Sequence, residues 1–149
     1  MRSNGMQDKK QAGFTLIEIM VVVVIISVLV GMLAPNIVGR ADEARVTAAK
    51  FDISALVEAF DMYKLDNYQY PSTDQGLQAL ISKPSGSPDA KNWREGGYIK
   101  KRDVPKDPWG NEYLYISPGV DGPYDLFSFA ADGAEGGEGD NADIGNWNL

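Results

Sequence analysis

Residues 19–38 read Ile-Met-Val-Val-Val-Val-Ile-Ile-Ser-Val-Leu-Val-Gly-Met-Leu-Ala-Pro-Asn-Ile-Val, a run of 20 residues without a charged side chain. An α-helix of about 20 apolar residues is long enough to cross the hydrocarbon layer of a bilayer. A discarded signal peptide has a shorter apolar region, of roughly 7–15 residues, followed by a small-x-small cleavage site, and no such site follows this run. The run therefore predicts a single membrane helix that the mature protein keeps.

The charges before this run predict its orientation. Arg2, Lys9 and Lys10 precede it, against Asp8 alone. Positive residues tend to stay on the cytoplasmic side of a membrane helix, so we expect the C-terminal part of the chain on the outer side. Glu18 lies at the edge of the apolar run, where a carboxylate is costly, and it is therefore a candidate functional residue.

The composition narrows the possible functions. The 149 residues have room for one compact domain and one extended element, and they include neither cysteine nor histidine. Disulfides, thiolate or imidazole metal sites and Ser-His-Asp catalysis are therefore excluded. The net charge of −7 disfavours a nucleic-acid binder. Carboxylate or lysine chemistry remains possible, but we expect no enzyme.

The sequence after the apolar run predicts an amphipathic helix. Six apolar positions are spaced by three or four residues, so they share one helix face, and charged residues occupy mainly the other faces. These positions are Val46, Ala49, Ile53, Leu56, Phe60 and Tyr63. A helix over residues 14–66 would be on the order of 80 Å long. Its first half would have no partner within its own chain, which indicates an element used in assembly.

The remaining residues predict a small α+β domain. Residues 73–80 resemble a short helix, while residues 112–117 and 125–130 alternate apolar and polar side chains as strands do. Pro-Gly and Asp-Gly-Pro signals between these strands indicate an antiparallel hairpin, and residues 98–101 form a weaker strand candidate. We expect one face of this sheet to pack on the amphipathic half of the long helix.

The string Gly13-Phe14-Thr15-Leu16-Ile17-Glu18 resembles the signal sequence of type IV pilins and pseudopilins. The resemblance implies that a prepilin peptidase removes residues 1–13 as a leader, cutting between Gly13 and Phe14, and N-methylates Phe14. It also implies that Glu18 of one subunit neutralises the terminal amine of its neighbour. Pairing of the amine and carboxylate within one chain is the alternative.

Gly31 and Pro35 lie four residues apart within the apolar run. Proline removes one helical hydrogen bond and clashes with the preceding turn, so the pair predicts a kink. The resemblance adds a second interpretation, in which residues 31–35 unwind when subunits pack into a fibre. The sequence leaves both open.

Further strings are similar to those of the major pseudopilin of type II secretion systems: YPSTDQGLQAL (70–80), PKDPWGN (105–111), residues 113–119, and DGAEGG (132–137) continuing to DIGNW (143–147). This resemblance, with the signal motif, covers almost the whole chain. It implies a pilin-like fold with a transmembrane or fibre-core helix over residues 14–38 and a periplasmic domain over residues 39–149. The absence of a cysteine pair favours the secretion branch over type IV pilins.

The function implied is that of a structural subunit, which polymerises with itself from the bacterial inner membrane and drives folded proteins across the outer membrane. The implied partners are the membrane, minor pseudopilins, the prepilin peptidase and the inner-membrane assembly platform. One alternative is a type IV pilin or minor pseudopilin. Another, of a different class, is a membrane-anchored, calcium-dependent periplasmic binding protein or enzyme.

Residues 132–143, which we call the acidic loop, hold five carboxylates and four glycines and no basic residue. Such a loop either stays solvated or binds a hard cation that prefers oxygen ligands. The resemblance implies calcium, bound by the side chains of Asp132, Asp140 and Asp143 and by the Phe129 carbonyl. An alternative source of positive charge is the basic stretch of an adjacent subunit. Its members are Lys91, Arg94, Lys100, Lys101, Arg102 and Lys106.

Overall fold

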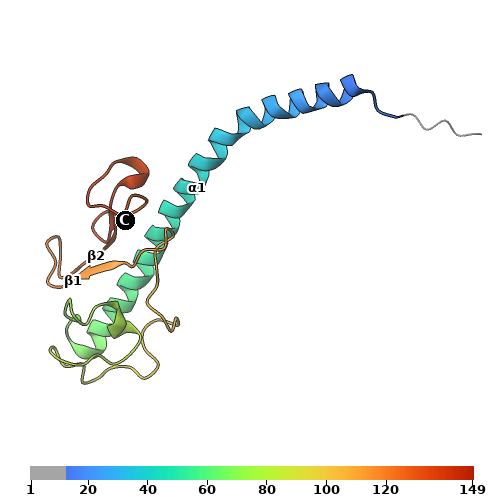
Figure 1. Ribbon diagram of the computed structural model, residues 1–149. Helices are drawn as coiled ribbons and strands as arrows, with labels where there is room; N and C mark the ends of the chain where they lie inside the picture. The colour runs from blue at the N-terminus through green and yellow to red at the C-terminus, as the bar shows by residue number, and fades with distance from the viewer. Residues whose placement is uncertain (1–12) are drawn as a thin grey trace, which may run out of the picture. The chain divides into compact units, whose positions relative to one another are not determined.

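The computed structural model describes residues 13–149 (Figure 1). The side chains of residues 33–38 lie outside this description. The helices are α1 (Leu16–Asn67) and two short 3-10 helices, η1 (Leu77–Leu80) and η2 (Gly139–Asn141). The strands are β1 (Leu114–Ile116), β2 (Asp125–Ser128) and β3 (Ile144–Gly145). The chain divides into two units, one ending at Gly39 and the other, called the head here, spanning Arg40–Leu149.

The first unit exposes its apolar side chains. Every large apolar side chain from Phe14 to Met32 is exposed. The Ser27 hydroxyl donates to the Val23 carbonyl oxygen at 2.7 Å, so this polar group is satisfied within the helix. An apolar surface of this extent marks a region that lipid or another protein covers.

The predicted membrane run and leader fall partly outside the described residues. In the part of the chain that the structure describes, no helix combines the length and apolar character needed to cross a membrane. Residues 33–38 of the predicted span, with Pro35 of the predicted kink, lie where side chains are not described. The leader, apart from Gly13, also lies outside the described residues.

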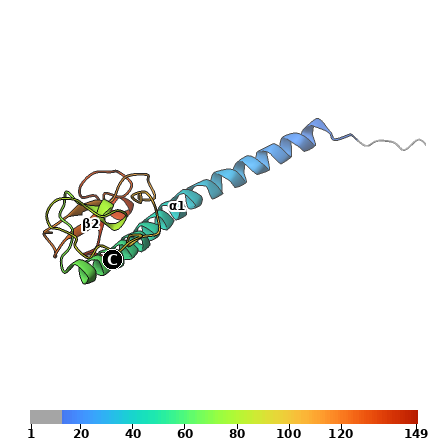
Figure 2. The same cartoon turned by 90° about the horizontal axis from the view of Figure 1, so that it is seen from below.

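The head is built on the amphipathic face of α1. Five of the six predicted positions are buried, and Val46 packs against the core from its edge, so the predicted face is confirmed. The Phe60 ring stacks on Tyr115 of β1 with 4.5 Å between ring centroids, and it also contacts Tyr124 at 5.2 Å. Aromatic pairs at these separations add to the stabilisation from burial alone. The sheet therefore packs on α1 as predicted (Figure 2).

The sheet has the order β1-β2-β3 with antiparallel pairing throughout. The predicted hairpin is confirmed, with Tyr115 opposite Leu126, although both strands are shorter than predicted. Strand β3 was not predicted, because two residues are too few to show an alternating pattern. Residues 73–80 form turns followed by η1, a 3-10 helix in place of the predicted short helix.

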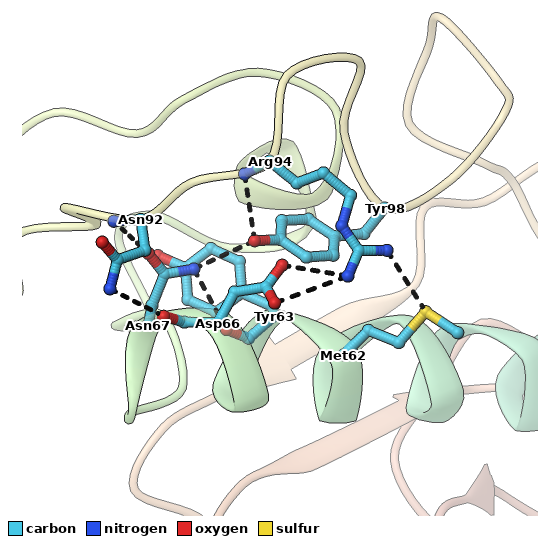
Figure 3. Close-up of polar contacts among 7 residues, drawn as sticks. All are labelled: Met62, Tyr63, Asp66, Asn67, Asn92, Arg94 and Tyr98. Carbon is cyan, nitrogen blue, oxygen red and sulfur yellow. Dashed lines mark hydrogen bonds and ion pairs between the residues drawn. The ribbon is translucent and has the colours of Figure 1, made fainter.

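The weak strand prediction for residues 98–101 is wrong. Tyr98 donates its backbone N–H to the Leu80 carbonyl oxygen at 2.7 Å, and no strand forms in this segment. The segment is fixed by the side chain of Asn67, at the end of α1 (Figure 3). Asn67 Nδ2 donates to the Tyr63 carbonyl oxygen and to Tyr98 Oη, both at 3.0 Å, and Asn67 Oδ1 accepts from the Asn92 N–H at 3.2 Å. Residues 98–101 are thus held by polar contacts to the end of α1 and not by the backbone hydrogen bonds of a strand.

Arg94 belongs to the same cluster (Figure 3). Its guanidinium pairs with the Asp66 carboxylate at 3.1 Å and lies over the Tyr98 ring, 5.3 Å from the centroid. Arg94 therefore binds an acid of its own chain. This differs from the other members of the predicted basic stretch, none of which forms an ion pair within the described part of the chain.

We expect the head to lose stability as the pH rises above about 10, the ordinary pKa of tyrosine. Burial, followed by the hydrogen bond to Asp61, raises the pKa of Tyr70 to about 12, and burial raises the pKa of Tyr113, Tyr115 and Tyr124 further. A raised pKa in the folded state contributes stability that is complete below the unfolded pKa and is lost as the pH passes toward the folded pKa.

In the test, the pH is raised from about 8 over a range of about three pH units. Phenolate absorbance and far-ultraviolet circular dichroism are recorded together at each pH. The expected result is that most phenolate appears together with loss of the helical signal. Simple titration of these tyrosines near their ordinary pKa, with the helical signal intact, would contradict their burial.

Candidate assembly and metal sites

The first turn of α1 contains a reciprocal pair of hydrogen bonds. The Glu18 N–H donates to Thr15 Oγ1 at 3.3 Å, and the Thr15 N–H donates to Glu18 Oε2 at 3.4 Å. This is a capping box, in which residues spaced Thr-x-x-Glu satisfy two backbone donors that the helix start leaves free. The arrangement was not predicted, although the spacing Thr15-Leu16-Ile17-Glu18 carries its signal.

The capping box leaves Glu18 able to accept a further partner. Glu18 is exposed, and of its two carboxylate oxygens only Oε2 accepts a hydrogen bond from the described residues. Phe14 is 80% exposed, and a Cβ added to Gly13 would meet no heavy atom within 4 Å. The bond between Gly13 and Phe14 therefore precedes the helix and is accessible. The predicted roles of these residues in processing and assembly stay predictions.

The acidic loop folds back on itself through Asp143. Asp143 Oδ2 accepts the Gly136 N–H at 2.9 Å, and the Asp143 N–H donates to the Gly136 carbonyl oxygen at 3.2 Å. Gly137 has φ +85°, and a Cβ at this position would collide with the Asn141 carbonyl oxygen. Glycine at 137 is therefore required by both the backbone conformation and the close approach.

The structure brings some of the predicted calcium ligands together and separates others. Phe129 and Asp143 line one hollow of about 450 Å³, together with Glu135. Asp140 lines another, of about 520 Å³, with Glu138. Asp132 lines neither hollow, and its Oδ1 accepts the Ala134 N–H at 3.1 Å. Over residues 13–149, as far as side chains are described, no three acidic residues form a group that could hold a metal ion.

One atom in the loop favours a cation. Asp143 Oδ1 is buried and has no hydrogen-bond partner among the described residues. A buried oxygen in this state calls for an ion or donor, because native structures rarely leave such an atom unpaired. The chemistry of the carboxylates and carbonyl fits a hard cation, while their spacing would have to contract around it. Calcium binding stays a prediction.

A long helix that starts in exposed apolar residues and packs on a small antiparallel sheet defines a pilin-like subunit. Residues 36–147 match the family described as "Type II secretion system (T2SS), protein G", and residues 8–34 match the "Prokaryotic N-terminal methylation motif". The chain belongs to the type II secretion system protein G family. It is a major pseudopilin, a structural subunit and not an enzyme, as the sequence predicted.

Similar proteins agree with this assignment. The chain is 58% identical over 142 residues to the type II secretion system core protein G of Pseudomonas aeruginosa, covering 95% of this chain and 99% of that protein. It is 57% identical to the core protein G of Vibrio cholerae, covering 95% and 94% respectively. The crystal structure of the major pseudopilin from enterohaemorrhagic Escherichia coli matches with a TM-score of 0.66 at 45% identity, covering 77% of this chain and 96% of that one.

Proposed function

We propose that residues 14–38 anchor the mature chain in the bacterial inner membrane and then enter the core of a fibre built from copies of this chain. The head lies in the periplasm, and growth of the fibre drives folded proteins across the outer membrane. The observation that carries this proposal is the uninterrupted exposure of apolar side chains from Phe14 to Met32. The internal hydrogen bond of Ser27 supports it, because a hydroxyl in lipid needs a partner within the protein.

The proposed partners follow from the steps of processing, membrane anchoring and fibre growth. The prepilin peptidase acts on the accessible bond between Gly13 and Phe14, the inner-membrane assembly platform adds subunits, and minor pseudopilins share the fibre. In the fibre, the Glu18 carboxylate neutralises the terminal amine of Phe14 in the next copy. Both charges would otherwise be desolvated without a partner, which costs several kcal/mol.

The first test is the chemistry of the mature N-terminus. Mass spectrometry of protein made with the peptidase is expected to show N-methylated Phe14 as the first residue. Protein made without the peptidase is the control and is expected to retain residues 1–13. A mature chain that begins elsewhere, or an intact leader in the presence of active peptidase, would contradict the proposed processing.

We propose that the acidic loop binds calcium through the carboxylates of Asp132, Asp140 and Asp143 and the Phe129 carbonyl. The bound ion would supply positive charge that offsets repulsion among the carboxylates. The chain contributes the glycine backbone, which allows the oxygens to turn inward, and the pairing of Asp143 with Gly136, which closes the loop.

Basic residues of a neighbouring head offer the alternative partner for this loop. Lys100 and Arg102 are exposed and form no ion pair within the described residues of their own chain. Replacing both by glutamate is expected to reduce fibre yield several-fold, because like charges would then face each other across the contact. Sedimentation and electron microscopy of assembled fibres give the measurement. Reversal of the exposed Lys50 and Lys83 changes the net charge equally and serves as the control. Equal yields from both variants would reject this contact.

A further inference from the structure

Asp107 is a buried acid that the proposed functions do not use. It is 5% exposed and lies in the turn before β1. Its Oδ1 accepts the backbone N–H of Trp109 at 3.1 Å and that of Asn111 at 2.8 Å. These bonds fix the turn, but they involve only one carboxylate oxygen.

The second carboxylate oxygen bonds to the end of β2. Ser128 is 1% exposed, and its hydroxyl donates to Asp107 Oδ2 at 2.6 Å. The same Ser128 oxygen accepts the Ala130 N–H at 3.0 Å. Asp107 and Ser128 are 21 residues apart in the sequence, so this bond joins the turn before β1 to the residues that lead into the acidic loop.

Ala130 makes the first corner of the path from β2 to the acidic loop. It is fully buried and has φ +54°, in the left-handed region that disfavours residues with a Cβ. A residue held in this region needs surrounding structure that over-determines its conformation. The Ser128 oxygen provides such a contact, because it accepts the Ala130 N–H and holds that peptide group in place.

The direction of the hydrogen bonds explains why an acid lies next to Ser128. A hydroxyl has one proton to donate and two lone pairs, whereas a carboxylate only accepts. The Ser128 hydroxyl therefore donates its hydrogen bond to Asp107, and its lone pairs stay free to accept the Ala130 N–H.

We infer that Asp107 and Ser128 are positioning residues for the acidic loop. They fix the left-handed corner at Ala130 and thereby direct the Phe129 carbonyl, before the corner, and Asp132, after it. The effect on the loop follows from the hydrogen bonds alone. Its effect on calcium rests on the calcium site under the proposed function.

The experiment compares Ser128→Ala and Asp107→Asn with the wild-type protein. Ser128→Ala leaves Asp107 Oδ2 and the Ala130 N–H without their partners. Asp107→Asn keeps an oxygen for the turn but presents an amide donor to Ser128. Amide hydrogen exchange without calcium reports the order of residues 129–143, and calorimetric titration with calcium chloride reports affinity. We expect faster exchange confined to this segment in both variants, and calcium affinity about 10- to 100-fold lower.

Asn67→Ala is the control for a general loss of stability. It removes a buried side chain with three hydrogen bonds, none of which involves the acidic loop. It is expected to speed exchange near residues 92–98 and to leave calcium affinity unchanged. A Ser128→Ala protein whose loop exchanges no faster than that of Asn67→Ala, with wild-type calcium affinity, would overturn the inference.

The remaining outcomes also decide between the proposals. If the wild-type protein takes up no calcium, the calcium proposal fails, and exchange of residues 129–143 alone decides the positioning role. If Ser128→Ala does not fold, Asp107→Asn decides, because its turn keeps both backbone bonds. If Asp107→Asn folds and its residues 129–143 exchange amide hydrogens at the wild-type rate, Asp107 is not a positioning residue.

Discussion

Glu18→Gln is expected to abolish fibre assembly, whereas Thr15→Ala is expected to reduce it only modestly. Glutamine keeps an oxygen that can accept the Thr15 N–H, so the capping box survives while the charge is lost. The amine of a neighbouring Phe14 would then be buried in an apolar fibre core without a counter-charge, at a cost of several kcal/mol. Thr15→Ala removes a cap that contributes about 1 kcal/mol and leaves the Glu18 charge intact.

The measurement is the yield of sedimentable fibres in cells that carry the complete secretion machinery, with membrane levels of each variant checked by immunoblot. The two substitutions separate the roles of Glu18, because one changes its charge and the other changes only the helix cap. Wild-type yield from Glu18→Gln would show that capping is sufficient. If Thr15→Ala forms no fibres although its membrane level is normal, the helix cap would likewise be the property that assembly requires.

Calcium is expected to protect the acidic loop from proteolysis and to raise the melting temperature, and Asp143→Asn is expected to remove both effects. A ligand at about one hundred times its Kd stabilises the folded state by about 2.7 kcal/mol. Asparagine can still accept the Gly136 N–H, so the substitution removes mainly the charge. The buried Asp143 Oδ1 makes this residue the most informative of the predicted ligands.

Glu95→Gln is the matched control, because it removes one charge from an exposed residue of the head that lies outside the acidic loop and lines neither of its hollows. It is expected to retain most of the calcium response. Limited proteolysis and thermal denaturation, each with calcium and with a chelator, give the two readouts. If the chelator changes neither the cleavage pattern nor the melting temperature of the wild-type protein, the calcium site is contradicted.

Periodicity predicted the parts of the fold that depend on burial. The buried face of α1 and the β1-β2 hairpin followed from spacing, because apolar positions must face a common core. Residues 98–101 were misassigned because their conformation depends on bonds to Leu80 and Asn67, which are distant in the sequence. Strand β3 is defined by its pairing with β2, which is distant from it in the sequence.

Site residues were likewise predictable where they are contiguous in the sequence and not where only folding brings them together. The motif around Gly13 and Glu18 was recognisable because its residues are contiguous, and its Thr-x-x-Glu spacing also contained the capping box. The bond between Asp107 and Ser128 could not be predicted, since it joins residues that only the folded chain brings together. Composition indicated the acidic loop but did not show which carboxylates approach one another.

The amide of Asn67 has a consequence for the charge that the head presents to its surroundings. Residues 92–98 are tied to the last turn of α1 by the Asn67 side chain and by the Asn92 amide, which donates to the Asp66 carbonyl oxygen at 3.0 Å. Arg94 adds an ion pair with the Asp66 carboxylate in the same cluster (Figure 3). Fraying of the helix from its C-terminal end would release these contacts together. The Arg94 guanidinium and the Asp66 carboxylate would then separate, so the order of one helix turn determines whether these two opposite charges are paired with each other or available to outside partners.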